Sequence, residues 1–193
     1  MDFGMLLFFD IDNVIANTDP VIRNIIREHT NGRIDLSQED VVEFNYCSCP
    51  TKTGQLLSKS EWDEVLSIFS TPKVLNSIEV FPGVQNYLDR LSKRYKIQLA
   101  TSRSPETKEA TIAWMQENRL DGYEVHFLDH GKKHEALRAA DVIVEDYYEQ
   151  AASFAQNGTR CFVFRYPWNA EKPPLPSIEW VEGWDELMDK LLP

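Results

Sequence analysis

The chain has 193 residues, with 20 lysines and arginines against 31 aspartates and glutamates, which leaves a formal net charge of −11. Its length predicts one domain with room for a small appendage, and its 42% apolar and 26% charged residues exclude a largely disordered chain. The acidic balance argues against a nucleic-acid polymer as partner, and the apolar stretch at residues 4–9 is far too short to span a membrane.

In chain order, apolar runs typical of buried strands alternate with amphipathic helical patterns. The predicted strands are 5–9, 96–100, 125–128, 142–144 and 161–164, and the predicted helices are 20–29, 60–69, 83–94, 105–118, 133–140, 148–156 and 184–191. Ser60 is the predicted N-cap of its helix. Strands separated by single helices predict an α/β fold, a doubly wound parallel sheet with helices on both faces.

One interval breaks this alternation. The first two strands are separated by far more residues than the dozen or so that a parallel crossover needs, and helix 83–94 alone supplies that crossover. Residues 14–80 are left over as an insertion after the carboxyl end of a strand, where long excursions commonly form a lid over a site. We therefore predict a core domain of residues 1–13 and 81–193, and a small helical cap subdomain of residues 14–80.

The first strand ends in two aspartates, Asp10 and Asp12, separated by Ile11. Alternate side chains share a face on extended backbone, so the two carboxylates are expected to point the same way while Ile11 points into the core. Ligands bind at the carboxyl edge of open parallel sheets, and two carboxylates aimed together repel unless a cation or a proton intervenes. Asn13 follows, at a position that suits a tight turn with positive φ.

A second buried strand, 142–144, also ends in two acids, Glu145 and Asp146. If the sheet is parallel, both acid pairs reach the same edge, and three or four carboxylate oxygens meet there. Hard oxygen ligands without histidine or cysteine favour Mg²⁺ over zinc. The repetition of a strand followed by acids is stronger evidence than either pair alone, and it predicts a magnesium site.

Two further segments carry groups suited to phosphate. Thr101, Ser102 and Arg103 end the second strand, where a hydroxyl and a backbone N–H can hold phosphate oxygens. The simpler interpretation of this segment is an N-cap for the helix that follows. Lys132 and Lys133 precede another helix and would be ordinary solvated surface, except that a site with several carboxylates needs a cation beside its metal.

The order of these motifs resembles that of the haloacid dehalogenase-like (HAD) hydrolase superfamily. The matching residues are Asp10-x-Asp12, Thr101, Lys132/Lys133 and Glu145-Asp146. The segments Asp-Ile-Asp-Asn-Val, Phe-Pro-Gly-Val, Ala-Thr-Ser-Arg and Val-Glu-Asp-Tyr are most similar to the 5′(3′)-deoxyribonucleotidase-like branch, including its small bacterial nucleotidases. The resemblance covers most of the chain, implies a Rossmann-like core, and puts the insertion where this superfamily carries its first type of cap.

The resemblance implies a phosphatase that works through an aspartyl-phosphate intermediate. Asp10 would be the nucleophile, and Asp12 would be the general acid for the leaving oxygen and then the base for water. Thr101 would bind the transferring phosphate. Lys133 would pair with Asp10 and the phosphate, and Lys132 is the competing choice. Lys133 is preferred because it stands two residues before Glu135-Ala136-Leu137, a spacing similar to that in relatives.

The implied cofactor is Mg²⁺, held by the Asp10 side chain, the Asp12 carbonyl, Asp146 and Glu145. The candidates for binding phosphate or substrate are Asn13, Thr101, Ser102, Arg103 and Lys132. Asn13 stands where glycine is usual, which alters how closely the backbone approaches phosphate. Glu145 stands where many members have aspartate, which shifts the carboxylate that binds the metal directly. The implied partner is a small phosphorylated metabolite, with a (deoxy)nucleoside monophosphate among the candidates.

Three alternatives stay open. A catalytically silent HAD-like binding protein would not need the intact acid and lysine set. A phosphotransferase, such as a sugar-phosphate mutase, would use the same acids. A haloacid dehalogenase in the strict sense has no need for an acid at the position of Asp12.

Several residues have two interpretations. The aromatic residues Phe44, Tyr46 and Trp62 either stack on a base or form the core of the insertion. Arg103 and Arg165 either reach a substrate or pair with the abundant surface acids.

Other potential sites are set aside. His126, His130 and His134 recur every four residues, but they fall across a predicted strand and Gly131, so we interpret them as surface residues. The three cysteines are few and odd in number, and the opening Met1 and Asp2 bring no basic leader. These features predict free thiols in a reducing compartment, the cytoplasm.

Overall fold

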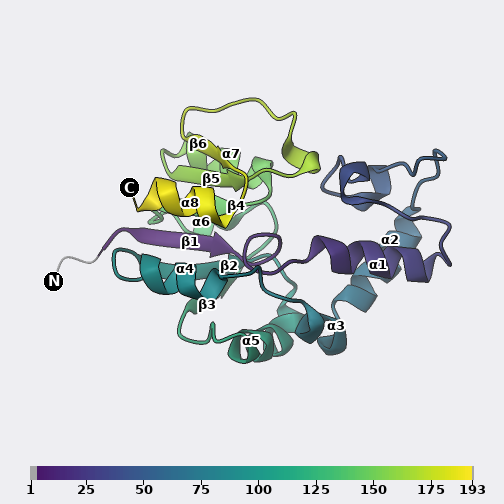
Figure 1. Ribbon diagram of the computed structural model, residues 1–193, viewed down its shortest axis with the longest axis horizontal. Coiled ribbons are helices and arrows are strands. Elements are labelled where there is room, and N and C mark those ends of the chain that lie inside the picture. The colour runs from purple at the N-terminus through teal and green to yellow at the C-terminus, as the bar shows by residue number, and fades with distance from the viewer. Residues whose placement is uncertain (1–3, 193) are drawn as a thin grey trace.

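The computed structural model describes residues 4–192; residues 1–3 and residue 193, which the predicted core includes, lie outside the described residues. Six strands form one parallel sheet in the order β3-β2-β1-β4-β5-β6 (Figure 1). The strands are β1 (Leu6–Asp10), β2 (Lys96–Thr101), β3 (Glu124–Phe127), β4 (Val142–Glu145), β5 (Arg160–Phe164) and β6 (Ile178–Val181). The predicted α/β class with a parallel sheet is confirmed.

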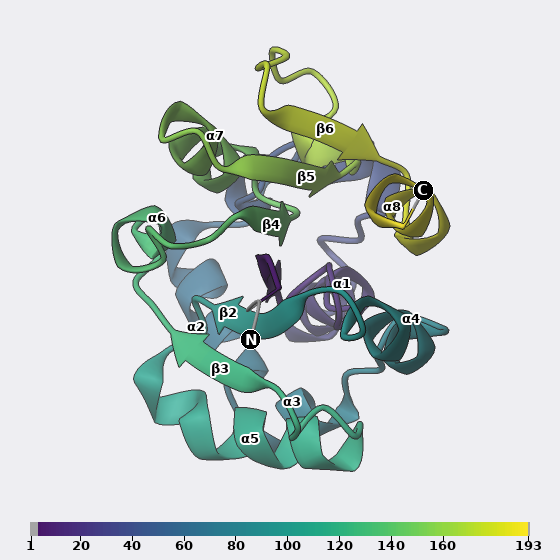
Figure 2. The ribbon, with the colours of Figure 1, turned by 90° about the vertical axis from the view of Figure 1, so that its left-hand side faces the viewer.

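Helices cover both faces of the sheet, and Figure 2 shows α6 and α7 on one side of the strands with α4 and α8 on the other. The helices on the two faces are α4 (Val84–Leu91), α5 (Lys108–Glu117) and α8 (Trp184–Leu191), and then α6 (Lys133–Ala136) and α7 (Tyr148–Gln156). Side-chain alternation along each strand feeds both layers: Leu7 and Phe9 join the apolar core of the first face, and Phe8 joins the core of the second. This is the doubly wound architecture that the sequence predicts.

The acid-terminated strands are neighbours in the sheet. The chain winds outward from β1 through β2 and β3, and then returns to form β4 on the other side of β1. The register pairs Phe9 of β1 with Val144 of β4, so the two strands end side by side. Because ligands of open α/β sheets bind where the winding direction reverses, this edge is the expected position of a site.

The insertion, residues 14–80, is helical and lies beyond the carboxyl ends of the strands (Figure 1). Its elements are α1 (Asp19–His29), η1 (Gln38–Asp40), η2 (Tyr46–Ser48), α2 (Lys59–Phe69) and α3 (Pro72–Ser77). Ile26, Val41 and Val65 lie in an apolar cluster of this segment, and Trp168 packs into the same cluster from η4 (Pro167–Asn169), the turn that follows β5. At its other end, Leu75 and Ile78 join the core of the sheet, so the insertion is anchored to the sheet edge from two sides.

One strand and one α-helix of the described residues were not predicted from the sequence. β6 is an edge strand that pairs only with β5 within the described sheet, and its half-buried Glu179 and Trp180 interrupt the apolar pattern expected of a buried strand. α3 spans six residues, which is too short to show helical periodicity.

Element ends also differ from the prediction. The N-cap of α2 is Ser58, not Ser60, because the Ser58 hydroxyl accepts the Glu61 N–H while the Glu61 carboxylate accepts the Ser58 N–H at 2.9 Å, a reciprocal capping box. α6 ends at Ala136 rather than at residue 140. The helix expected at 105–118 opens with the 3₁₀ turn Pro105–Thr107 before α5 begins.

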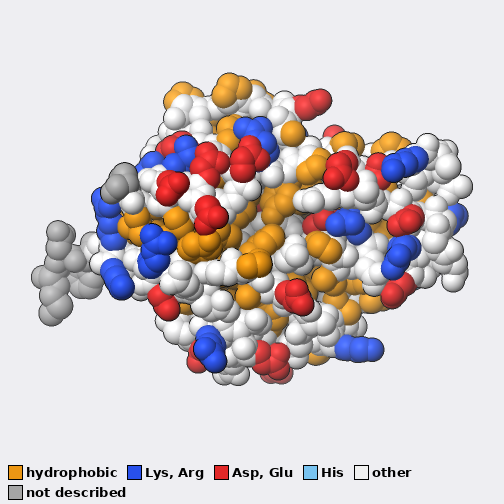
Figure 3. Space-filling view, viewed as in Figure 1, with side chains coloured by type: hydrophobic (Ala, Val, Ile, Leu, Met, Phe, Trp, Pro, Cys, Tyr) orange, Lys and Arg blue, Asp and Glu red, His pale blue; other side chains and the backbone are white. Residues whose placement is uncertain are grey.

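The surface agrees with the composition. Figure 3 shows lysines and arginines interspersed with acidic side chains on the face in view. Within residues 4–192, no helix is both long enough and apolar enough to cross a membrane. Cys47, Cys49 and Cys161 are all free thiols, as predicted.

Candidate active site

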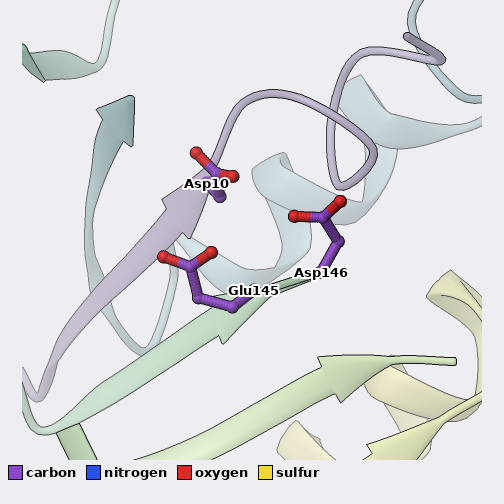
Figure 4. A group of neighbouring side chains, drawn as sticks. All are labelled: Asp10, Glu145 and Asp146. Atoms are coloured by element: carbon purple, nitrogen blue, oxygen red, sulfur yellow. The ribbon is translucent and has the colours of Figure 1, made fainter. Parts of the chain in front are cut away.

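The carboxylates at the ends of β1 and β4 converge. Figure 4 shows Asp10 at the tip of β1, with Glu145 and Asp146 at the tip of β4. Each of these side chains offers one oxygen, and these oxygens all lie within 4.8 Å of one another. The side chains are buried, with Glu145 and Asp146 exposing 1% and 2% of their surface. Parallel strand ends therefore bring together acids that are 135 residues apart in sequence, as the strand-then-acids pattern predicts.

A lysine completes the cluster. Lys133, the first residue of α6, places its Nζ 2.7 Å from Asp10 Oδ1 and 3.0 Å from Glu145 Oε1, and its side chain is buried. Lys132 is exposed, and its Nζ lies 3.7 Å from the Asp129 carboxylate instead. Of the two lysines that the sequence left open, the structure brings Lys133 to the acids and leaves Lys132 outside.

The charges in this cluster do not balance. Three carboxylates face the single ammonium group of Lys133, a formal excess of −2. Burial raises the pKa of Asp10 and of Asp146, and burial raises the pKa of Glu145 to about 8 despite the opposing charge of Lys133. Burial works against the charged form of Lys133 as well, but Asp10 and Glu145 outweigh it and raise the pKa of the ammonium group.

This donor set fits a divalent cation. All the converging atoms are hard carboxylate oxygens, which suit Mg²⁺. Glu145 Oε2 is buried and has no hydrogen-bond partner among the described residues, an expensive state for a carboxylate oxygen. A divalent cation would supply that partner and cancel the excess charge.

Asp12 forms an ion pair with Arg103 outside this cluster, and the pair carries no net charge. The Arg103 guanidinium binds its carboxylate with both ends of the fork, Nε to Oδ2 at 3.0 Å and Nη2 to Oδ1 at 2.8 Å. The Thr18 hydroxyl donates to Oδ1 at 2.6 Å. Burial disfavours the charged form of Asp12, but the Arg103 charge outweighs it and lowers the pKa of the carboxyl. Arg103 is buried against Trp114, so its interpretation as a residue paired with surface acids is wrong, whereas exposed Arg165 does pair with the surface acid Glu182.

The other predicted site residues are Asn13, Thr101 and Ser102. Asn13 adopts the expected positive φ, 57°, but its side-chain amide faces Asp146 and the start of α1. Thr101 is fully buried, and its hydroxyl accepts the Arg103 N–H at 3.1 Å. Ser102 lines the pocket described next.

A pocket of about 220 Å³ opens onto these charged groups. Its polar end contains Asp10, Asp12, Lys133, Glu145 and Asp146. Its other end is apolar, and is formed by Ile22, Phe44, Tyr46, Trp62, Leu66 and Phe69 of the insertion together with Trp168. The arrangement can hold a molecule that has an anionic group at one end and a flat apolar group at the other.

Three aromatic residues that were not predicted as site residues also line this pocket: Tyr147, Trp168 and His130. Phe44 of the insertion packs against Tyr147 in a tilted arrangement, with ring centroids 4.3 Å apart, and stacks on His130, at 5.8 Å. Tyr147 follows Asp146 directly, and Trp168 lies in the turn after β5 at the same sheet edge, so position after a strand end was the available signal for both. His130 carried no such signal; it is exposed, as its interpretation as a surface residue predicts, and it also lines the pocket.

The sequence and the fold have counterparts in other proteins. A family model described as 5′ nucleotidase, deoxy (pyrimidine), cytosolic type C protein matches residues 4–192. No curated protein matches the sequence itself.

Three solved structures illustrate the fold. A haloacid dehalogenase-like hydrolase from Streptococcus pneumoniae superposes with a TM-score of 0.67 at 14% identity, over 98% of this chain and 99% of that one. CbbY from Rhodobacter sphaeroides, in complex with phosphate, gives 0.60 at 14% identity over 96% of both chains. A HAD hydrolase from Bacillus subtilis bound to magnesium gives 0.62 at 11% identity over 100% of both chains.

At these identities the structures establish the shared fold alone, whereas the family model spans nearly the whole chain. The chain therefore belongs to the 5′ nucleotidase, deoxy (pyrimidine), cytosolic type C family, a nucleotidase-like branch of the HAD superfamily, and is a hydrolase of phosphoric monoesters.

Proposed function

We propose that this protein is a Mg²⁺-dependent phosphatase that hydrolyses a (deoxy)nucleoside monophosphate through an aspartyl-phosphate intermediate. The observation that carries the proposal is the Asp10 carboxylate, held 2.7 Å from Lys133 within the buried acid cluster and facing a pocket with an aromatic far end. The family membership and the magnesium-bound and phosphate-bound relatives of the same fold support it.

Asp10 attacks the phosphorus atom. The bond from phosphorus to the leaving oxygen breaks, a bond from phosphorus to the Asp10 carboxylate forms, and Asp12 gives a proton to the leaving oxygen. Water then attacks the phosphorus of the aspartyl-phosphate and gives a proton to Asp12, which releases phosphate and restores Asp10. The ion pair with Arg103 suits the second step directly, because it keeps Asp12 as the carboxylate that accepts the proton. The first step requires a protonated Asp12, which carries the proton taken from water in the preceding turnover or one taken from solvent, with its ion pair to Arg103 open.

Lys133 offsets the charge of the reacting groups. A carboxylate and a phosphate dianion repel each other, and the ammonium group next to Asp10 reduces that repulsion where charge develops. The residues that would hold Mg²⁺ are Asp10, Asp146 and Glu145, with the carbonyl of Asp12. When bound, the metal would supply further positive charge against the phosphate oxygens.

The insertion is proposed to act as a cap that selects the substrate. Residues 14–80 supply most of the apolar end of the pocket, including Tyr46 and Trp62, whose rings stack 5.3 Å apart. A nucleobase is flat and apolar on its faces, so it suits this end while its phosphate reaches Asp10. Three free thiols fit the proposed cytoplasmic location.

The test is a phosphate-release screen over deoxynucleoside and nucleoside monophosphates, sugar phosphates and p-nitrophenyl phosphate, with Mg²⁺ or with EDTA. We expect release that requires Mg²⁺, with the highest kcat/KM for a nucleoside monophosphate, and no release by Asp10→Asn. Release that is equally fast in EDTA would contradict the metal requirement. A preference for phosphates without a base would contradict the substrate, and no release from any compound would favour a silent binding protein.

A further inference from the structure

Asn13 lies at the junction between the acid cluster and the insertion. It follows Asp12 in the turn after β1, and it is buried with a left-handed backbone, φ 57°. Its backbone N–H donates to Ala16 at 2.8 Å, and its carbonyl accepts the Tyr166 hydroxyl at 2.8 Å. The backbone of this residue is therefore held by its own turn and by the loop after β5, independently of its side chain.

The side chain of Asn13 makes two directed hydrogen bonds. Its Nδ2 donates to Asp146 Oδ2 at 3.0 Å, and its Oδ1 accepts the backbone N–H of Asp19 at 2.9 Å. Only one orientation of the amide is possible, because the Asp19 N–H can only donate and therefore requires the amide oxygen. The NH₂ group is thus committed to the carboxylate of Asp146.

No other side chain among the described residues donates a hydrogen bond to the Asp146 carboxylate. Lys133 orients both Asp10 and Glu145, but it makes no hydrogen bond to Asp146. Trp168 and Asn169 hold the backbone carbonyl of Asp146, at 3.1 and 2.9 Å, and leave its carboxylate alone. Among the described residues, Asn13 is the side chain that donates to this carboxylate, and it occupies one oxygen while the other oxygen accepts no hydrogen bond.

We propose that Asn13 is a positioning residue for the metal: its amide fixes the Asp146 carboxylate so that one oxygen is held by the protein and the other faces the cation. This inference rests on the proposed role of Asp146 in holding Mg²⁺. Partners that orient metal ligands through such hydrogen bonds typically change metal affinity by about 10–100-fold when they are removed. The same amide also ties Asp146 to α1, because Asp19 begins that helix and accepts hydrogen bonds from Tyr46 and Arg23.

Asn13→Gly tests the proposal cleanly. Glycine adopts a φ of 57° without strain, so the variant removes the amide and leaves the backbone turn in place. Asn31→Gly is the matched control, because Asn31 also has a positive φ, 49°, but is exposed at the end of α1. The dissociation constant of Mg²⁺ is measured by titration calorimetry on metal-free wild type, Asn13→Gly, Asn31→Gly and Asp146→Asn.

We expect Asn13→Gly to raise the dissociation constant by about 10–100-fold, Asn31→Gly to leave it unchanged, and Asp146→Asn to abolish binding. In parallel, the Mg²⁺ concentration for half-maximal release from p-nitrophenyl phosphate should rise by the same factor in Asn13→Gly.

Different results would overturn the positioning role of Asn13 and the proposed function. Equal Mg²⁺ affinity in wild type and Asn13→Gly would overturn the positioning role and leave the proposed function standing. Absence of Mg²⁺ binding by the wild type would overturn the proposed function itself. A drop in the unfolding temperature of Asn13→Gly in EDTA with unchanged Mg²⁺ affinity would show that the amide only anchors α1, and would also overturn the proposal.

Discussion

The two ends of the pocket come from different parts of the chain. The charged end consists of side chains at the carboxyl edge of the sheet, where Asp10, Glu145 and Asp146 outnumber Lys133. The apolar end comes mostly from the insertion, including Tyr46 and Trp62, and contains no buried excess of charge. Strand ends thus fix the costly charged groups within a rigid sheet, whereas a separate helical segment shapes the space that faces them. The comparison predicts that changes at the charged end abolish chemistry, while changes at the apolar end alter which substrate binds.

The largest effect is expected for Asp10→Asn. An amide cannot form the aspartyl-phosphate, so phosphate release should fall by more than the roughly 10²–10⁴-fold that acid–base help contributes. Because the variant removes one of three clustered carboxylates, it should stay folded, with an unfolding temperature in EDTA no lower than that of wild type. Release rates and thermal unfolding of the same preparation check both statements, and near-normal turnover would refute the role of Asp10.

Asp12→Asn should cost about 10²–10⁴-fold with a nucleoside monophosphate, whose alkoxide leaving group needs a proton. The loss in the first step should be much smaller with p-nitrophenyl phosphate, because p-nitrophenolate leaves without one. Comparing the rates of alcohol or phenol release in the first turnover, before hydrolysis of the intermediate limits the rate, measures the difference for the two substrates. Equal losses for both would mean that Asp12 does not protonate the leaving oxygen.

At the apolar end, Trp62→Ala should raise KM for a nucleoside monophosphate by about 2–10-fold, the loss of one aromatic contact. KM for glycerol phosphate, which has no base, should be unchanged, and kcat should change little for either substrate. Trp62→Phe serves as the conservative control and should retain most of the affinity. A fall in kcat for both substrates would show that the insertion does more than select.

The smallest effect is a pH dependence of stability in EDTA. Burial raises the pKa of Glu145 to about 8 in the folded protein, and raises those of Asp10 and Asp146, so the native state holds protons that the unfolded chain releases above about pH 4.5. The stability contributed by these protonated groups is present at low pH and is lost as pH rises toward 8. The unfolding temperature in EDTA should therefore be lower at pH 8 than at pH 6, and Glu145→Gln should weaken that dependence. A higher unfolding temperature at pH 8 in EDTA would contradict the shifted pKa values.

Much of this molecule is predictable from its sequence, because its buried strands are short apolar runs bounded by helices. The meeting of Asp10 with Glu145 and Asp146 follows from parallel strands that end at one edge. β6 was not predicted, because an edge strand is only half buried. α3 was not predicted, because six residues carry too little periodicity.

Contacts between loops are harder to predict from the sequence than strands and helices are. The ion pair of Arg103 with Asp12, the hydrogen bond from the Asn13 amide to Asp146 and the packing of Phe44 against Tyr147 each join segments that only the tertiary fold brings together. Residue type and position after a strand single out candidates for such contacts, but not their partners. That is why Arg103 and Asn13 could be predicted as candidates for phosphate, whereas their contacts with the carboxylates of Asp12 and Asp146 could not be predicted.

The most direct test of the account is to trap the phosphorylated enzyme. Asp12→Asn is mixed rapidly with p-nitrophenyl phosphate and Mg²⁺, quenched in acid, and analysed for p-nitrophenol and for phosphoryl groups on its peptides by mass spectrometry. The first step needs no general acid with this substrate, and the second lacks its base, so the intermediate should accumulate. We expect a burst of one p-nitrophenol per active site and a phosphoryl group on the peptide that contains Asp10. No burst with an unmodified Asp10 peptide, or a phosphoryl group on a different residue, would contradict it.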